Sequence, residues 1–164
     1  MIQANCRSSF TIEDFNFIID TLSTDEQNKI ALTELLSDEE MRDDILDHEL
    51  LFKTIMENPG FMKISPQLYF YVLIRRVFLQ YQITNREISD YVASMLAEFG
   101  STNRTYSISK GSEKKYLYLT DMLSDFVEAS SSFEAFLLQS HLGNYSLFMT
   151  GVFSDYINRK ATYG

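Results

Sequence analysis

The chain is poor in the residues that mark several protein classes. Its 164 residues include one cysteine, two prolines, six glycines and no tryptophan. A single thiol cannot form an internal disulfide, so the cross-links typical of small secreted domains are excluded. With so few glycines and prolines there are few sites for the turns of a many-stranded sheet, which favours long helices.

Long apolar runs and catalytic motifs are also missing. No stretch reaches the ~18 consecutive apolar residues of a transmembrane helix. The start, MIQANCRSSF, lacks the basic and apolar regions of a signal peptide. We therefore expect a cytoplasmic protein with no membrane association. The G-x-S-x-G, P-loop and G-x-G-x-x-G motifs are absent, so we predict no catalytic residue and no cofactor, and an enzyme is disfavoured.

Acidic residues are abundant and lie mainly at one end of a chain whose net charge is −9. Residues 1–60 hold 14 acidic and 4 basic residues, a net −10, whereas residues 61–164 hold 9 and 10, a net +1. An acidic surface repels phosphate backbones, which disfavours nucleic acid as a partner. The acidic segment is then either a solvated face or a docking face for a basic partner protein.

Apolar periodicity and capping signals predict helices through most of the chain. Thr11 and Asp14 have the spacing of a capping box for a first helix that reaches Thr21. Further helices are expected from Ser23 or Thr24 to Leu36, from Ser37 to Glu57, from Ser65-Pro66, from Thr84 or Asn85 to Gly100, from Thr120, and from Phe133 to Arg159 with an interruption near Gly143 or Gly151. The β-prone segments RTYSIS and EKKYLYL predict a small β-hairpin or ordered loop near residues 104–119.

These elements predict an all-α fold, a single helical bundle of about six or seven helices. The whole chain, residues 1–164, is expected to form one domain. In it, an acidic helical segment over residues 1–60 packs on a core formed by residues 61–164. The helix PQLYFYVLIRRVFLQ is apolar nearly all round, so we expect it at the centre.

Two adjacent arginines, Arg75 and Arg76, interrupt this apolar helix. Successive helical residues point about 100° apart, so at least one guanidinium should be buried, and a buried charge must be paired. The expected partner is a carboxylate such as Asp90, Asp121 or Asp125. Alternatively, one arginine reaches the surface with its stem packed, or an arginine anchors an anionic ligand through its planar fork.

A polar trio in the last helix offers a second candidate site. His141, Asn144 and Tyr145 stand at positions i, i+3 and i+4. Such a trio usually satisfies its own hydrogen bonds in a core, and Gly143 and Gly151 would let a second helix approach closely. The alternative is a pocket for an anionic small molecule inside the bundle. Its expected lining is Arg75, Arg76, Tyr69, His141, Asn144 and Tyr145.

One acidic helix carries weak metal candidates. Glu40, Asp44 and His48 line up at i, i+4 and i+8, and such groups bind metals. One helix rarely supplies a whole site, so we predict no metal. His48 also lies on an apolar stripe with Ile45 and Phe52, which is typical of a core histidine.

Four sequence blocks resemble, in order, a group of bacterial all-helical proteins without an established activity. They are SPQLYFYVLIRR, ISDYVASMLAEFG, YLYLTDMLSDF (which includes YLTDML) and HLGNYSLFMTGVFSDY, and they span more than half of the chain. The resemblance implies a bacterial helical protein and no transferable site residues. Members continue past the last block with a basic stretch, so this chain is a short member or part of a longer one.

Two functions are compatible with these observations. The first is a non-enzymatic protein-interaction or regulatory helical module that binds an unknown protein partner or self-associates. The lack of motifs, the uneven charge and the aromatic richness favour it. The second is the small-molecule binding protein or enzyme with the pocket described above.

Overall fold

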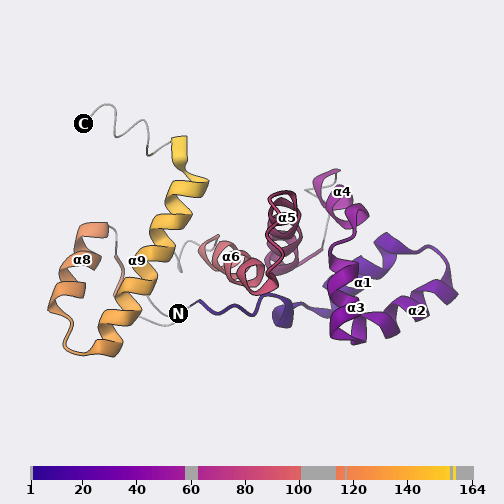
Figure 1. Ribbon diagram of the computed structural model, residues 1–164, viewed down its shortest axis with the longest axis horizontal. Helices are drawn as coiled ribbons and strands as arrows, with labels where there is room; N and C mark the ends of the chain where they lie inside the picture. Colours follow the sequence, from indigo (N-terminus) through magenta and orange to yellow (C-terminus); the bar gives the residue numbers. More distant parts are fainter. Residues whose placement is uncertain (1, 58–62, 101–113, 117, 156, 158–164) are drawn as a thin grey trace. The chain divides into compact units, whose positions relative to one another are not determined.

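The structure is a computed structural model that describes residues 2–57, 63–100, 114–116, 118–155 and 157. Every regular element of these residues is a helix (Figure 1), so the predicted all-α helical bundle is confirmed. The elements are η1 (Arg7–Ser9), α1 (Ile12–Leu22), α2 (Glu26–Ser37), α3 (Glu39–Leu46), α4 (Glu49–Glu57), α5 (Pro66–Gln80), α6 (Arg86–Phe99), α8 (Leu119–Glu128) and α9 (Ser132–Val152). None of the described helices combines the length and the apolarity needed to span a membrane.

The contacts divide the chain into two compact units. The first unit is Gln3–Ser94, and the second is Met1–Ile2 with Met95–Gly164. The boundary falls within α6. The expectation that an acidic segment over residues 1–60 packs on a core of residues 61–164 in one domain stays a prediction.

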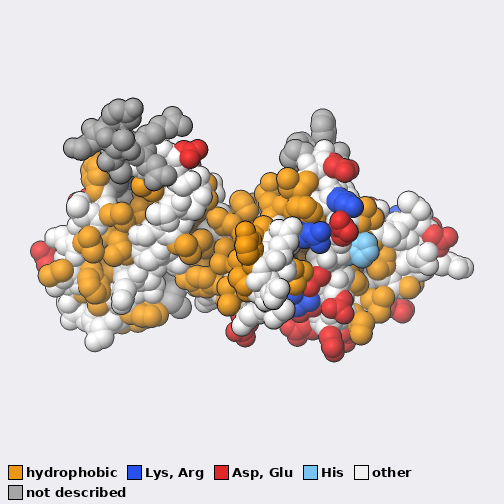
Figure 2. Space-filling model, turned by 45° about the horizontal axis from the view of Figure 1, so that its top comes forward, with side chains coloured by type: hydrophobic (Ala, Val, Ile, Leu, Met, Phe, Trp, Pro, Cys, Tyr) orange, Lys and Arg blue, Asp and Glu red, His pale blue; other side chains and the backbone are white. Residues whose placement is uncertain are grey.

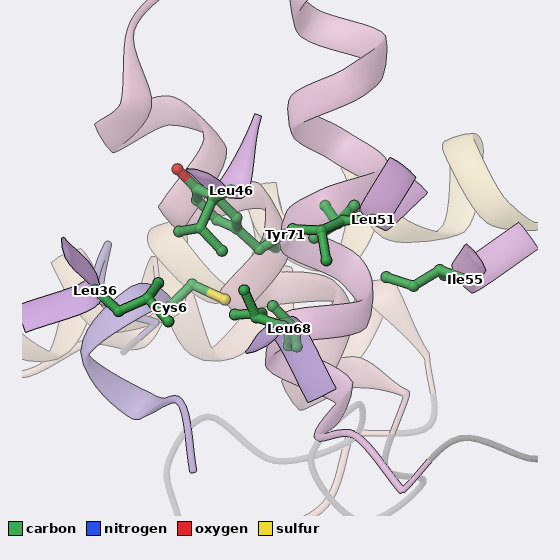
Figure 3. Packing of buried hydrophobic residues seen from close by; sticks show 10 residues of the cluster. Cys6, Leu36, Leu46, Leu51, Ile55, Leu68 and Tyr71 are labelled. Atoms are coloured by element: carbon green, nitrogen blue, oxygen red, sulfur yellow. The ribbon is translucent and has the colours of Figure 1, made fainter. Parts of the chain in front are cut away.

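The first unit has an apolar core to which α1 to α6 and the N-terminal segment contribute. Helix α5 is a main contributor, because its stripe of Leu68, Tyr71 and Val72 is buried. Figure 3 shows side chains of this core pointing toward one another from the N-terminal segment and from several helices. The cluster comprises Cys6, Ile18, Leu36, Leu46, Leu51, Ile55, Leu68, Tyr71, Val72 and Ala93.

A buried carboxylate links the starts of α1 and α5. The predicted capping box is present, because Thr11 Oγ1 accepts from Asp14 N and Asp14 Oδ2 accepts from Thr11 N at 2.8 Å. Asp14 is fully buried and also accepts from Ser65 N at 2.7 Å and Ser65 Oγ at 2.6 Å. Ser65 in turn caps α5 as predicted, through Leu68 N.

The predicted long helix from Ser37 to Glu57 is two helices. Ser37 ends α2, and Asp38 caps α3 by accepting from Met41 N. Helix α3 ends at Leu46, and the ring Nδ1 of His48 accepts from Leu50 N in the first turn of α4 at 3.2 Å. The predicted core position of His48 is therefore wrong, because the break between α3 and α4 turns its side chain to solvent.

The other boundaries agree more closely with the sequence. The second helix is capped by Asp25 rather than Ser23 or Thr24. Asn85 caps α6 by accepting from Glu87 N, and Gly100 follows its last residue as predicted. Helix α9 begins after the Ser131 cap, close to the predicted Phe133. It is not interrupted at Gly143, and it ends at Val152, beside Gly151 and short of the predicted Arg159.

The predicted hairpin over residues 104–119 lies mostly outside the described residues. Its described residues 114–116 have no regular structure, and Leu119 begins α8. No strand occurs in the described part of the chain, so this part gives the hairpin no support.

The second unit packs α8 against α9. Phe99, at the end of α6, makes edge-to-face contacts with His141 and Phe148, at 5.6 and 5.4 Å between ring centroids. Buried aromatic pairs of this geometry add stability beyond their area. The other buried apolar residues of this unit include Met95, Tyr116, Met122, Leu138 and Tyr145.

Candidate functional site

Arg75 forms the buried ion pair that its position predicts. The residue is 4% exposed, and its Nε and Nη2 donate to the two oxygens of Asp47 at 2.9 and 3.1 Å. Its Nη1 donates to the carbonyls of Ile83 and Thr84, at 3.4 and 3.0 Å. The guanidinium is therefore occupied on each of its nitrogens by groups of this chain.

The prediction that Asp90, Asp121 or Asp125 pairs with Arg75 is wrong. Asp90 is bound by Arg7, and Asp125 accepts from the hydroxyl of Tyr116 and pairs with Lys114. The break between α3 and α4 instead places Asp47, the last residue before His48, beside α5. The correct partner comes from the acidic segment and not from α6 or α8, which hold Asp90, Asp121 and Asp125.

Two more arginines extend this pairing. Arg86 donates to both oxygens of Asp47 at 3.2 and 2.9 Å and pairs with Asp43 at 3.2 Å. Arg7 donates to Asp43 at 2.5 and 2.6 Å and to Asp90 at 2.9 Å. Arg7, Arg75 and Arg86 with Asp43, Asp47 and Asp90 form what we call the arginine–aspartate network, in which three positive charges meet three negative ones.

The network holds Arg7 and Arg86 in the charged form. Burial by itself would lower the pKa of Arg86, but the nearby hydroxyl of Tyr71 and the charges of Asp47 and Asp43 raise it above its ordinary value. For Arg7, hydrogen bonds to Asp90 and Asp43 likewise outweigh burial and raise the pKa. Arginines of this kind do not release protons near neutral pH, so they cannot serve as general acids.

Sequence reasoning missed Arg7, Asp43, Asp47 and Arg86. One signal was available, because Asp43 and Asp47 stand four residues apart in an acidic helix and so share a face. A second signal was the acidic excess of residues 1–60, because clustered carboxylates must be either solvated or paired with basic side chains. Nothing in the sequence indicates that Arg7, near the other end of the segment, would join them.

Arg76 behaves differently from its neighbour. Its side chain is one third exposed, lies 3.6 Å from Glu49 Oε1 and covers the ring of Phe52 at 5.7 Å. The alternative in which one arginine reaches the surface with a packed stem therefore describes Arg76. Tyr69, also expected at the pocket, is half-buried with its ring edge-to-face on Phe70 at 5.2 Å.

The remaining pocket candidates belong to the second unit. His141, Asn144 and Tyr145 are all buried in α9, whereas the two arginines and Tyr69 belong to the first unit. A shared pocket lined by both groups stays a prediction.

The glycines of α9 do not make the close helix contact that their spacing suggested. A methyl group built at Gly143 or Gly151 meets no described atom within 4 Å. Both positions lie on the exposed side of α9, because its buried stripe is Leu138, His141, Tyr145 and Phe148.

No metal site forms around the weak candidates. The break after Leu46 separates His48 from the helix that carries Glu40 and Asp44, so the predicted alignment of all three on one helix is wrong. Among the described residues, no group of three or more His, Cys, Asp or Glu side chains could hold a metal ion.

An exposed apolar stripe runs along α8. Leu119, Leu123 and Val127 are spaced four residues apart, so they are neighbours on one side of the helix, and Val127 is 82% exposed. Phe133, in the first turn of α9, is 70% exposed. Figure 2 shows hydrophobic side chains gathered over the part of the molecule, at the left, that holds α8 and α9. We call Leu119, Leu123 and Val127 the α8 stripe.

The comparisons with known proteins add no further evidence. Neither a family model, nor a curated protein, nor a solved structure matches this chain.

Proposed function

We propose that this protein is a non-enzymatic protein-interaction module. The observation that carries the proposal is the α8 stripe. Exposed contiguous apolar side chains are unfavourable in water and, when rimmed by polar residues, are typical of docking surfaces. The resemblance to bacterial helical proteins and the single cysteine support a bacterial protein of the cytoplasm, where a partner protein or a second copy would be met.

The arginine–aspartate network argues against the anionic-ligand alternative. A ligand anchored by Arg75 would have to displace Asp47 and leave that carboxylate with only Arg86. Removing one partner from a buried pair is strongly unfavourable. Arg76 is the more accessible arginine, but its stem is already packed on Phe52.

Native mass spectrometry of the purified protein, beside its denatured mass, tests the proposal. We expect no bound small molecule, and we expect a partner captured from source cells to rebuild a defined complex from purified components. An extra mass on the order of a few hundred daltons, lost on denaturation, would point to a ligand pocket instead. Failure of every captured protein to rebuild a complex would also overturn the proposal.

Charge reversal tests whether the acidic segment takes part. Glu39 and Glu40 are exposed at the start of α3, so replacing them with lysine leaves the arginine–aspartate network intact. Asp43 and Asp47 should be left unchanged, because their loss would unfold the site and mimic a lost partner. A complex that survives both reversals would assign the acidic segment of α3 to solvation alone.

A further inference from the structure

We infer that Asp43, Tyr71 and Asp90 form a recognition site for an arginine residue of a partner protein, and that Arg7 fills this site until the partner arrives. We call these three residues the arginine site. The inference goes beyond the proposed function, because it concerns a different surface, in the first unit, and does not depend on the α8 stripe.

The arginine site contacts each nitrogen of a guanidinium and one of its faces. Nη1 of Arg7 donates to both oxygens of Asp43, at 2.5 and 2.6 Å. Nε donates to Asp90 Oδ2 at 2.9 Å, and Nη2 lies 2.8 Å from the same oxygen. The guanidinium carbon lies over the ring of Tyr71, 5.8 Å from its centroid. A planar fork that also stacks on an aromatic ring distinguishes arginine from lysine, whose ammonium is a point charge.

The site also binds the backbone of its occupant. The backbone N–H of Arg7 donates to Asp90 Oδ1 at 3.0 Å. One carboxylate therefore holds the side chain and the main chain of the same residue. A free guanidinium ion offers only the first of these groups, whereas an arginine within a polypeptide offers both. The ligand class is thus an arginine residue of a peptide chain.

The walls of the arginine site come from helices and not from the N-terminal segment. Asp43 lies on α3, Tyr71 on α5 and Asp90 on α6, and all three belong to the first unit. The N-terminal segment, residues 3–9, supplies only the occupant. The side chain of Arg7 is 15% exposed, so the site lies at the surface, where a second chain can reach it.

The N-terminal segment has few other polar ties to the unit. Apart from those of Arg7, its side-chain hydrogen bonds stay within the segment, with one exception. The thiol of Cys6, which points into the core in Figure 3, donates to the carbonyl of Gln67 at 3.3 Å. A thiol is a weak donor. Arg7 is therefore the main polar anchor of the segment.

Charge makes the exchange conditional on the ligand. Without Arg7, Asp43 keeps Arg86 at 3.2 Å. The side chain of Asp90 is 5% exposed, and among the described residues only Arg7 pairs with it. An uncompensated buried carboxylate is strongly unfavourable, so the segment stays in place until another arginine replaces its own. A short tether gives Arg7 a millimolar effective concentration, which a partner overcomes by adding contacts around its arginine.

Rescue of an emptied site tests the inference in the full chain. Arg7→Ala removes the occupant, and N-acetyl-arginine amide, which carries both recognised groups, is added at about 10 mM. N-acetyl-lysine amide at the same concentration controls for charge and ionic strength. We expect the arginine probe to raise the melting temperature of Arg7→Ala protein by about 3 °C or more over the lysine probe. Arg76→Ala is the matched control, because it removes an arginine outside the site, and it should show no such difference.

The parent protein gives a second measurement that needs no variant. Cys6 precedes Arg7, so lifting the segment exposes its thiol. An arginine that captures the open form raises the population of that form in proportion to its occupancy. We expect the arginine probe to accelerate labelling of Cys6 by a thiol reagent about fivefold or more, and the lysine probe to leave the rate unchanged. This measurement decides the matter if Arg7→Ala protein does not fold.

Three results would overturn the inference. The first is a melting temperature or a labelling rate that responds equally to the two probes. The second is an equal response of Arg7→Ala and Arg76→Ala, which would indicate a general effect of arginine on the protein. The third is a dimer, seen by light scattering, that Arg7→Ala dissociates, since the site would then hold the segment of a second copy. All three leave the proposed function standing, because its own test is the complex rebuilt from purified components.

Discussion

At the scale of single residues, Arg75 and Arg76 are adjacent and identical but differ in burial and in pairing. Arg75 is buried and held by Asp47 in a two-point contact. Arg76 lies near the surface with one long contact to Glu49 at 3.6 Å. Breaking a buried pair leaves an uncompensated charge, whereas exposed pairs contribute little.

We therefore expect Arg75→Ala to lower the free energy of unfolding by about 3–5 kcal/mol. Arg76→Ala should lower it by about 1 kcal/mol or less, apart from the packing lost on Phe52. Urea denaturation of both variants beside the parent protein measures the difference. Equal midpoints for the two variants would show that the Asp47 contact adds no stability.

Cys6 gives a prediction for alkaline pH. Burial and the negative charge of nearby Asp90 raise the pKa of its thiol to about 12, whereas an exposed cysteine ionises near pH 8.5. The folded protein thus holds this proton more tightly than the unfolded chain. The resulting stability is complete below about pH 8.5 and is lost as the pH rises toward 12.

The same burial should make Cys6 inert in the native protein. At pH 8 we expect a thiol reagent to label it only as fast as the chain opens, because the reactive thiolate is absent. Labelling rates with and without urea check this. A native rate close to the rate in urea would mean that the thiol is exposed.

At the scale of helices, Asp14 connects two elements that are distant in sequence. It completes the capping box of α1 and accepts two hydrogen bonds from Ser65, the cap of α5. We expect Asp14→Ala to cost more stability than the loss of an ordinary cap, because buried donors on Ser65 would be left unsatisfied.

Asp25 is the matched control for Asp14, since it caps α2 at an exposed position. Asp25→Ala should cost about 1 kcal/mol, and Asp14→Ala about 3 kcal/mol or more. Thermal melts rank the two. The role assigned to Asp14 fails if its variant is no less stable than that of Asp25.

Gly143 lies in the interior of α9 with open space beside it. Alanine restricts the unfolded chain more than glycine and favours the helix, so Gly143→Ala should stabilise the protein by about 0.5–1 kcal/mol. A melting temperature that falls instead would reveal a close contact on this side of α9.

At the scale of the whole molecule, the net charge of −9 acts against compactness. Salt screens the mutual repulsion of exposed acids over about 10 Å at 0.1 M, while the partly buried network is screened less. We therefore expect the melting temperature to rise as sodium chloride increases from about 10 to 150 mM. A fall over that range would mean that exposed ion pairs outweigh the repulsion.

Much of the fold was predictable because its signals are local. The Thr11–Asp14 capping box, the Ser65-Pro66 start and the Asn85 cap each involve residues within one helical turn. The break at His48 was not predictable in this way. The apolar spacing runs through it unbroken, and Asp47, the C-cap of α3, contacts Arg75 and Arg86, which are 28 and 39 residues away.

The sequence by itself determined the helical class, most helix starts, the need to pair a buried arginine and the uneven charge. All four follow from composition and from the spacing of residues close together in the chain. Only the tertiary structure decided which carboxylate meets which arginine, because pairing at long range depends on how whole helices pack. It also decided which apolar residues of α8 remain in solvent. Periodicity locates an apolar arc, but the width that a neighbour covers depends on how that neighbour packs.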